Sequence, residues 1–193
     1  MNRENHVYPW WFGYLLISPL RKLRDNPVTM LGPYLKPGMS ILDVGCAMGY
    51  FSLAMAGMCG ENARVFCVDL QAKMLEVLEK RARRVGLASR IETRVCTGES
   101  LQIADLAGQV DFALVYAVMH ESRDPQRFLR DIHRALRKDG VLFFGEPAGP
   151  ISPLEFEQEI ALIKQMDFAE IPSRHPHRPM STVFCKKPDA VEM

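Results

Sequence analysis

Two glycines and an acidic residue have the spacing of a cofactor-binding loop. Gly45 and Gly49 lie between the apolar run 40–44 and a helical pattern that begins at Tyr50, and Asp69 ends the next apolar run, twenty positions after Gly49. Glycine permits tight turns and a close approach of ligand to backbone, and the N-terminus of the following helix favours polar or anionic groups. An acid at a strand end can accept hydrogen bonds from both hydroxyls of a ribose. The pattern predicts a loop for a ribose-containing cofactor.

The alternative interpretation of this segment is purely structural. Gly45 and Gly49 would then serve only turn geometry, and Asp69 would cap the next helix. That alternative leaves Asp43, which stands beside the loop, without a role. We therefore expect Asp43 to belong to the binding site as well.

Polar side chains that could take part in a reaction follow two later apolar runs. His120 and Glu121 come after the run 112–117, and Glu146 comes after the run 140–144. In an open parallel sheet the ligand lies at the carboxyl ends of the strands, so these groups are expected at the mouth of the same site. An imidazole titrates in the range useful for a general base, and a carboxylate can orient an acceptor. His120 and Glu146 are therefore the candidate catalytic residues; the alternatives are a loop-capping His120 and a backbone contact for Glu146.

The hydrophobic periodicity predicts the scaffold that these residues need. From Ser40 onward short apolar runs alternate with helical patterns, which is typical of βα units around a parallel sheet. The expected strands are 40–44, 64–68, 91–95, 112–117 and 140–144, and the expected helices are 50–58, 73–85, 125–136 and 153–166. Asp124-Pro125 resembles a helix start, and Ser152-Pro153-Leu154-Glu155 matches a capping box.

Two last strands, 168–173 and 182–186, have no helical pattern between them and are predicted to pair as an antiparallel hairpin at the sheet edge. The expected fold class is α/β: a doubly wound, mostly parallel seven-stranded sheet with an antiparallel edge strand. The loop between these strands carries His175 and His177 beside Arg174 and Arg178. It could bind an anionic substrate, or it is a solvated charged loop.

Composition limits the classes of function. The chain has 193 residues, of which 48% are hydrophobic and 24% charged, as expected for one globular domain. Its 24 basic and 23 acidic residues give no broad electrostatic reason to expect nucleic acid as a partner. The 5 cysteines form no C-x-x-C pair, so no metal site is expected. No apolar run reaches the roughly 20 residues of a membrane span, and the apolar stretch 7–17 lacks the leading basic residues of a signal peptide. A cytoplasmic location is expected.

The segment ILDVGCAMG at 41–49 resembles the first motif of the class I S-adenosylmethionine-dependent methyltransferases, which is an apolar pair, Asp, any residue, Gly, any residue, Gly or small, any residue, Gly. The segments VFCVDLQAKML, CTGESL, VDFALVYAVMHE and LRDIHRALRKDGVLFFGEP resemble later motifs of that family in the same order. The resemblance covers about 31–187, and VMHE is similar to the quinone-biosynthesis and small-molecule branch. It implies a Rossmann-like fold, S-adenosylmethionine as cofactor, and a small or lipid-like methyl acceptor.

The resemblance also implies roles for individual residues. Gly45, Cys46 and Gly49 would line the methionine part of the cofactor, Asp69 would hold the ribose, and Leu70 would pack on adenine. The remaining residues of the implied cofactor set are Asp43, Ala47, Thr97, Gly98, Glu99 and Ala117.

One position departs from the family pattern. Many relatives have an acid after the third strand that receives the adenine amino group, and Thr97 stands there in this chain. Glu99 follows two residues later. Either residue is therefore the candidate adenine contact.

The segment 1–30 is expected to differ from the single cofactor-binding domain 31–193. It carries the aromatic cluster YPWWFGY at 8–14 and basic residues within 21–24. Three interpretations stay open: a lid over the acceptor pocket, a helix packed as part of the core, or an interfacial helix that touches a membrane peripherally.

Methyl transfer by in-line displacement is the leading prediction. The activated methyl sits on the cofactor, so the protein mostly positions and desolvates, with a base needed only if the acceptor must lose a proton. A nicotinamide-dependent oxidoreductase is one alternative, weakened because Ala47 replaces the second glycine of G-x-G-x-x-G and Ser52 stands near the third. The other alternative is a catalytically inactive cofactor-binding protein.

Overall fold

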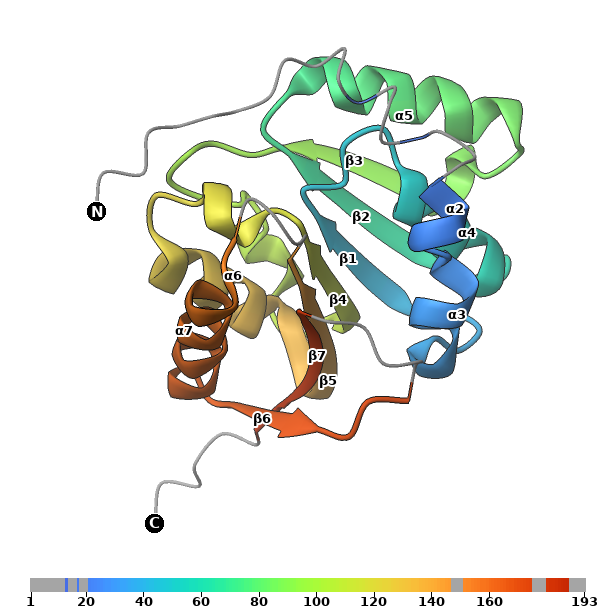
Figure 1. Cartoon of the computed structure of the whole chain (residues 1–193). Helices are drawn as coiled ribbons and strands as arrows, with labels where there is room; N and C mark the ends of the chain where they lie inside the picture. Colours follow the sequence, from blue (N-terminus) through green and yellow to red (C-terminus); the bar gives the residue numbers. More distant parts are fainter. Residues whose placement is uncertain (1–12, 14–16, 18–20, 147–150, 175–179, 188–193) are drawn as a thin grey trace.

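The computed structural model describes residues 13, 17, 21–146, 151–174 and 180–187. Seven strands form one sheet in the order β3-β2-β1-β4-β5-β7-β6, and helices lie on both of its faces (Figure 1). The strands are β1 Ser40–Val44, β2 Arg64–Asp69, β3 Ile91–Val95, β4 Val110–Tyr116, β5 Leu136–Gly145, β6 Phe168–Ile171 and β7 Ser181–Lys186.

The described helices near the N-terminus are short, and those later in the chain are longer. The α-helices are α2 Arg21–Arg24, α3 Pro27–Leu31, α4 Tyr50–Met58, α5 Ala72–Arg84, α6 Pro125–Ala135 and α7 Pro153–Gln165. Short 3₁₀ turns are η2 Gly32–Tyr34, η3 Ala88–Arg90, η4 Ala104–Leu106 and η5 Met119–Glu121. No helix among the described residues has the length and apolar character that crossing a membrane requires.

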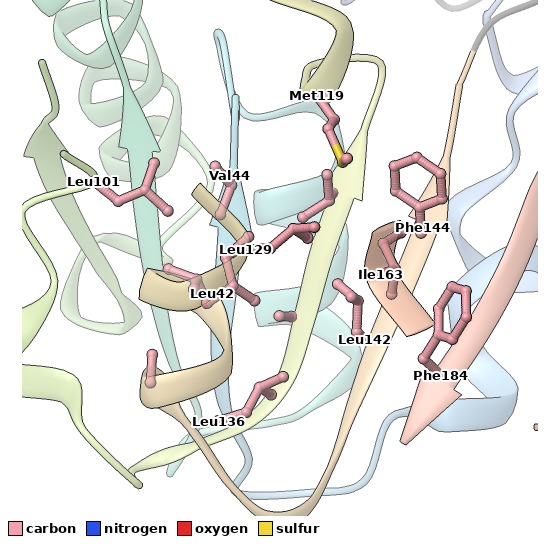
Figure 2. Packing of buried hydrophobic residues seen from close by; sticks show 14 of the residues in the cluster. Leu42, Val44, Leu101, Met119, Leu129, Leu136, Leu142, Phe144, Ile163 and Phe184 are labelled. Carbon is pink, nitrogen blue, oxygen red and sulfur yellow. The ribbon is translucent and has the colours of Figure 1, made fainter. Parts of the chain in front are cut away.

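Helices α6 and α7 cover one face of the sheet. Ile132 of α6 is fully buried in the hydrophobic cluster on this face. Leu129 of α6 and Ile163 of α7 are buried there as well, with Leu42 and Phe144 of the strands (Figure 2). Each such side chain contributes about 1.5–3 kcal/mol through its burial. This packing fixes the segments that follow β4 and β5.

Helices α3, α4 and α5 cover the opposite face. Met30, Met55 and Leu78 pack there with Ile41 and Val65, which alternate along their strands with the residues of the first face. Because both faces are covered, the central strands are apolar on both sides. The predicted doubly wound α/β sheet is confirmed.

The strand pairings place three strand ends side by side. Val44 at the end of β1 pairs in parallel with Val68 of β2 and with Val115 of β4. The loops after β1, β2 and β4 therefore leave the sheet at the same edge, where the predicted site residues stand.

The predicted hairpin at the other end of the sheet is present. Strand β7 pairs antiparallel with β5 and with β6. Strand β7 is thus the antiparallel strand, inserted beside β5, and β6 is the outermost strand.

Strand β5 begins earlier than the sequence pattern predicts. The expected helix to Leu136 ends at Ala135, and Leu136 already pairs with Val110. The buried ammonium of Lys186 donates to the Leu136 carbonyl at 3.0 Å, which favours the extended backbone there. The pairing then shifts register before Val141, with Asp139 at a positive φ of 59°, so the expected start at Gly140 is wrong.

Both predicted helix starts are confirmed. The Asp124 carboxylate accepts from the backbone N–H of Arg127 at 2.9 Å. In α7 the Ser152 hydroxyl accepts from the Glu155 N–H, and the Glu155 carboxylate accepts from the Ser152 N–H. A cap of this kind contributes about 1 kcal/mol.

The aromatic cluster 8–14 lies outside the described residues except for Gly13, and so do His175, His177 and Arg178. Helix α3 crosses the predicted boundary at residue 30, and its Met30 and Leu31 are buried in the core. The domain boundary stays a prediction.

Candidate cofactor and acceptor site

A cavity of about 610 Å³ opens at the carboxyl ends of β1, β2 and β4. This volume lies within the range of small-molecule sites. Of the predicted residues, those that line it are Asp43, Gly45, Cys46, Ala47, Asp69, Leu70, Thr97, Gly98, Glu99, Ala117 and His120. Gly49 and Glu146 stand behind this lining.

The glycines of the loop are needed for its geometry. Gly45 has a φ of +71°, and a Cβ built on it would lie 2.6 Å from Val118 Cγ2. Gly49 has a φ of +76° and begins α4, and a Cβ there would collide with Leu78. An added side chain at either position would thus collide with the protein itself. The glycines place the loop, and the loop lines the cavity.

Asp69 both holds the loop and faces the cavity. One carboxylate oxygen accepts from the backbone N–H of Ala47 and the other from that of Gln71, each at 2.8 Å. Burial raises the pKa of Asp69, and these backbone bonds lower it in part. Each carboxylate oxygen can accept a second hydrogen bond, which leaves capacity for two ribose hydroxyls. The capping and ribose interpretations are compatible.

Asp43 is a buried acid beside the same loop. It is 3% exposed, and the Ser52 hydroxyl of α4 donates to its carboxylate at 2.5 Å. Burial raises the pKa of Asp43 from 3.8 to about 7; the Ser52 bond and the charge of Arg21 lower it, and the charge of Asp69 raises it. A cationic ligand in the cavity would favour the carboxylate form.

The turn after β3 brings both candidate adenine contacts to the cavity. The Thr97 hydroxyl accepts from the backbone N–H groups of Glu99 and Ser100, at 3.3 and 3.1 Å. Leu70, on the neighbouring loop, is 42% exposed and lines the same space. Which of Thr97 and Glu99 meets adenine stays open.

His120 and Glu146 form a directly bonded pair. Nδ1 of His120 lies 2.7 Å from Glu146 Oε2, and Glu146 Oε1 accepts from the N–H groups of Met119 and His120 at 3.0 and 3.2 Å. The Glu146 side chain is fully buried, whereas His120 is 18% exposed and lines the cavity. Glu146 therefore acts on His120 and its turn.

The surroundings of His120 favour its protonated form. Burial lowers the pKa of His120, but the bond to Glu146 and the charges of Glu146, Glu121 and Glu159 raise it, and the net pKa lies above the ordinary value of 6.5. Glu121 is the next residue in the same turn, and its Oε1 lies 4.0 Å from His120 Nε2. Burial also raises the pKa of Glu121, while the His120 charge lowers it.

The described part of the N-terminal segment lies along the cavity. Gly13 is buried, and a Cβ on it would lie 2.9 Å from both Met48 and Met74, so its backbone passes close to the glycine loop. Ile17 and Arg21 line the cavity. The segment therefore contacts the site at several points of its length.

Asp25 bonds this segment to the end of β4. Its carboxylate accepts from Tyr116 Oη at 3.0 Å and from Arg21 Nε at 3.2 Å, and its carbonyl accepts from Tyr50 Oη at 2.8 Å. The Arg21 guanidinium lies 4.7 Å from the ring centre of Tyr50 and 5.1 Å from that of Phe51. Sequence reasoning missed this cluster, because an acid before Asn26-Pro27 carries no signal for a partner 91 positions away.

The described residues contain no group of three or more His, Cys, Asp or Glu side chains arranged to hold a metal ion. Cys46 and Cys96 line the cavity. Burial raises the pKa of both thiols, that of Cys96 to about 11. These cysteines are thus suited to packing.

The chain is similar to proteins of known families and structures. The model of a methyltransferase domain family matches residues 42–144, which are 103 of the 193 residues. A demethylmenaquinone methyltransferase from Lactobacillus johnsonii is 26% identical over 130 residues, which are 66% of this chain and 52% of that protein. A ubiquinone biosynthesis O-methyltransferase from Actinobacillus pleuropneumoniae is 34% identical over 150 residues, which are 73% of this chain and 60% of that protein.

The chain thus spans between half and three fifths of the length of these two relatives. A solved structure covers it more fully. A SAM dependent methyltransferase from Aquifex aeolicus superimposes with a TM-score of 0.78 and 19% identity, over 93% of this chain and 99% of that chain. The likeness shows the same fold. Since the family model matches more than half of the residues and includes the glycine loop, Asp69 and His120, the chain belongs to the methyltransferase domain family, in the class I S-adenosylmethionine-dependent group that its motifs resemble.

Proposed function

We propose that the protein transfers a methyl group from S-adenosylmethionine to a small acceptor, with His120 as the general base. The observation that carries the proposal is the His120–Glu146 pair, bonded at 2.7 Å, on a cavity shared with the glycine loop and Asp69. A base on the cofactor cavity is useful when the acceptor must lose a proton.

The residues present fit the cofactor. Asp69 has acceptor capacity for ribose hydroxyls, and the buried Asp43 offers a carboxylate to a cationic ligand. The loop after β1 (45–48) and the turn after β3 (97–99) both line the cavity, so a ligand extended along the strand ends would contact both. When bound, S-adenosylmethionine would supply an activated methyl group on its sulfonium for in-line transfer to the acceptor.

The protein's part in the reaction is to position and to move a proton. Glu146 accepts from Nδ1–H of His120, which leaves Nε2 as the acceptor nitrogen on the cavity side. Nε2 then takes the proton that the acceptor releases. Glu146 is a positioning residue, because its buried side chain contacts His120 and the turn.

The acceptor is proposed to be small or lipid-like. Relatives named for quinone biosynthesis support this class at 26–34% identity. The aromatic residues Tyr50, Phe51, Tyr116 and Phe128, which line the cavity, provide an apolar surface for it.

The N-terminal segment 1–30 is proposed to act as a lid over the cavity, a proposal that rests on its described residues. Gly13 against Met48 and the bond between Asp25 and Tyr116 support this role, because they hold the segment on the cavity from both ends. A lid excludes water and positions the acceptor during transfer.

The test of the proposed function combines binding with turnover. Calorimetry should show binding of S-adenosylmethionine and none of NAD, which separates methyl transfer from nicotinamide chemistry. Product detection by mass spectrometry, with phenolic and amine acceptors, separates an enzyme from an inactive binding protein. His120→Ala should bind the cofactor like the parent and lose methylation by roughly 100-fold or more. Equal turnover in His120→Ala contradicts the role of His120.

A further inference from the structure

Two hydrogen-bond acceptors lie close together at the cavity, one on the proposed base His120 and one on its neighbour Glu121. Oε1 of Glu121 lies 4.0 Å from Nε2 of His120, and both residues line the cavity. Glu146 holds the other ring nitrogen of His120 at 2.7 Å. His120 and Glu121 both lie on the 3₁₀ turn η5, which is held by a hydrogen bond from the Glu121 N–H to the Val118 carbonyl at 3.1 Å.

The distance between these two atoms is too long for a hydrogen bond. When His120 is in its basic form, Nε2 carries only a lone pair, and a carboxylate oxygen is also an acceptor. A ligand between them must therefore donate to both. A lone hydroxyl has one hydrogen and satisfies only one of the two.

Hydrogen-bond lengths restrict the donor further. Two bonds of about 2.8 Å from a single donor atom reach acceptors that are 4.0 Å apart, and so do bonds from two donor atoms that lie close together. A primary amine provides two hydrogens on one atom, and hydroxyls on adjacent carbons provide one hydrogen on each of two nearby oxygens.

We propose that Glu121 selects methyl acceptors that present two donor hydrogens side by side, one directed to His120 Nε2 and the other to Glu121 Oε1. This inference rests on the proposed function and names its substrate class. The first hydrogen leaves as a proton to Nε2, which later releases it to solvent. The second hydrogen stays on the acceptor, so Glu121 orients the reacting atom without taking its proton.

Glu121 has a competing role, which is to stabilise protonated His120 through its charge alone. The two roles differ in their consequences. A pure charge effect alters the protonation of His120 for every acceptor alike. An orienting hydrogen bond alters affinity only for acceptors that have the second hydrogen.

The experiment measures acceptor binding in the complex with S-adenosylhomocysteine, where no transfer can occur. Calorimetry compares catechol with phenol, and aniline with phenol, so that the two members of each pair are uncharged near neutral pH and differ in the second donor hydrogen. The variants are Glu121→Ala and Glu121→Gln, which keeps an acceptor oxygen without the charge. Glu76→Ala is the matched control, because Glu76 is an exposed acid of α5 paired with Lys73.

The expected result is that catechol, aniline or both bind the parent about tenfold or more tightly than phenol, the single-donor partner. In Glu121→Ala the dissociation constants of the two acceptors of each pair should differ by no more than about twofold, while the affinity for the single-donor acceptor stays the same. Glu121→Gln should keep part of the preference, and Glu76→Ala should keep all of it. The catechol comparison tests recognition of a hydroxyl pair, and the amine comparison tests recognition of an amine.

Three outcomes overturn the inference: no preference in the parent, a preference that survives Glu121→Ala, or a loss in Glu121→Ala that is equal for both members of each pair. The proposed function is judged separately, by methylated product from the preferred probe with S-adenosylmethionine. If the parent prefers the two-donor acceptor but forms no methylated product from it, the role of Glu121 stands and the role of His120 as base is contradicted.

Discussion

Asp69 shows how one carboxylate serves both the loop and its ligand. Its two carboxylate oxygens accept from the N–H groups of Ala47 and Gln71, and Asp69 also lines the cavity. Asp69→Asn should weaken S-adenosylmethionine binding by about ten- to a hundredfold, because a charge-assisted bond contributes roughly 1.5–3 kcal/mol. Calorimetry measures the dissociation constant, and a melting curve checks that the loop remains folded. An unchanged dissociation constant in a folded variant would mean that the ribose is held elsewhere.

Glu146 sets the protonation of His120, so it should set the pH dependence of the reaction. Burial lowers the pKa of His120 and Glu146 raises it to a net value above 6.5. The base form appears as pH rises through this pKa, so kcat/KM should rise on an acid limb above pH 6.5. Glu146→Gln removes the raising charge and should move that limb to lower pH.

The same variant should lower the plateau of kcat/KM by roughly tenfold or more, because the imidazole loses its orienting partner. A pH–rate profile of parent and variant measures both effects. A plateau that falls while the acid limb stays in place would show that Glu146 supports the turn without tuning His120.

At the scale of elements, the contact between the N-terminal segment and β4 is a candidate latch. Asp25 is 5% exposed and accepts from the Tyr116 hydroxyl at 3.0 Å. Tyr116→Phe removes that one donor, so we expect S-adenosylmethionine to dissociate several-fold faster, with a melting temperature lower by only about 2–4 °C for a loss near 1 kcal/mol. Stopped-flow displacement measures the dissociation rate.

Tyr34→Phe provides the matched control for the latch. The Tyr34 hydroxyl accepts from the backbone N–H of Arg174 at 2.6 Å, and Tyr34 does not line the cavity. This variant should also melt a few degrees lower but keep the parent's dissociation rate. If both variants release the cofactor at the same rate, the bond between Asp25 and Tyr116 has only a structural role.

Local sequence signals predicted the elements well. The capping box at Ser152 and the cap at Asp124 define helix starts from a few neighbouring residues, and the structure has both. The start of β5 was missed because it depends on the pairing of Leu136 with Val110 and on a bond from Lys186, which lies 50 positions away. A propensity window cannot contain such a partner.

For the site too, local features could be predicted from the sequence and contacts between distant residues could not. The cavity brings together ten of the eleven predicted cofactor residues, because strand ends and glycine turns are local features. The bond from Asp25 to Tyr116, the collision of a Cβ at Gly45 with Val118, and the 4.0 Å gap beside His120 all depend on tertiary placement. Sequence patterns report which residue types stand at a strand end, but they do not report what those residues face.

For the molecule as a whole, the site has a cost in stability. Asp43 lies on β1, which is an interior strand between β2 and β4, and burial raises the pKa of Asp43 from 3.8 to about 7. An acid whose folded pKa is raised stabilises the fold fully below its unfolded pKa, and that contribution is lost as pH rises through the folded pKa. Stability attributable to Asp43 should therefore decrease between about pH 4 and pH 7.

Asp43→Asn removes this titration while keeping an oxygen that can accept from Ser52. Without cofactor the variant should melt about 3–8 °C above the parent at pH 8, since each unit of pKa shift corresponds to about 1.4 kcal/mol and only part of it is recovered. The difference should shrink as the pH falls to 5, because the parent's Asp43 then becomes protonated.

Ser52→Ala should have the opposite effect at pH 8 and melt below the parent, because the Ser52 bond lowers the pKa of Asp43. Saturating S-adenosylmethionine should stabilise the parent more than Asp43→Asn, because its cationic groups favour the carboxylate. A stability gain in Asp43→Asn that is the same at pH 5 and pH 8 would assign the effect to packing and not to the buried charge.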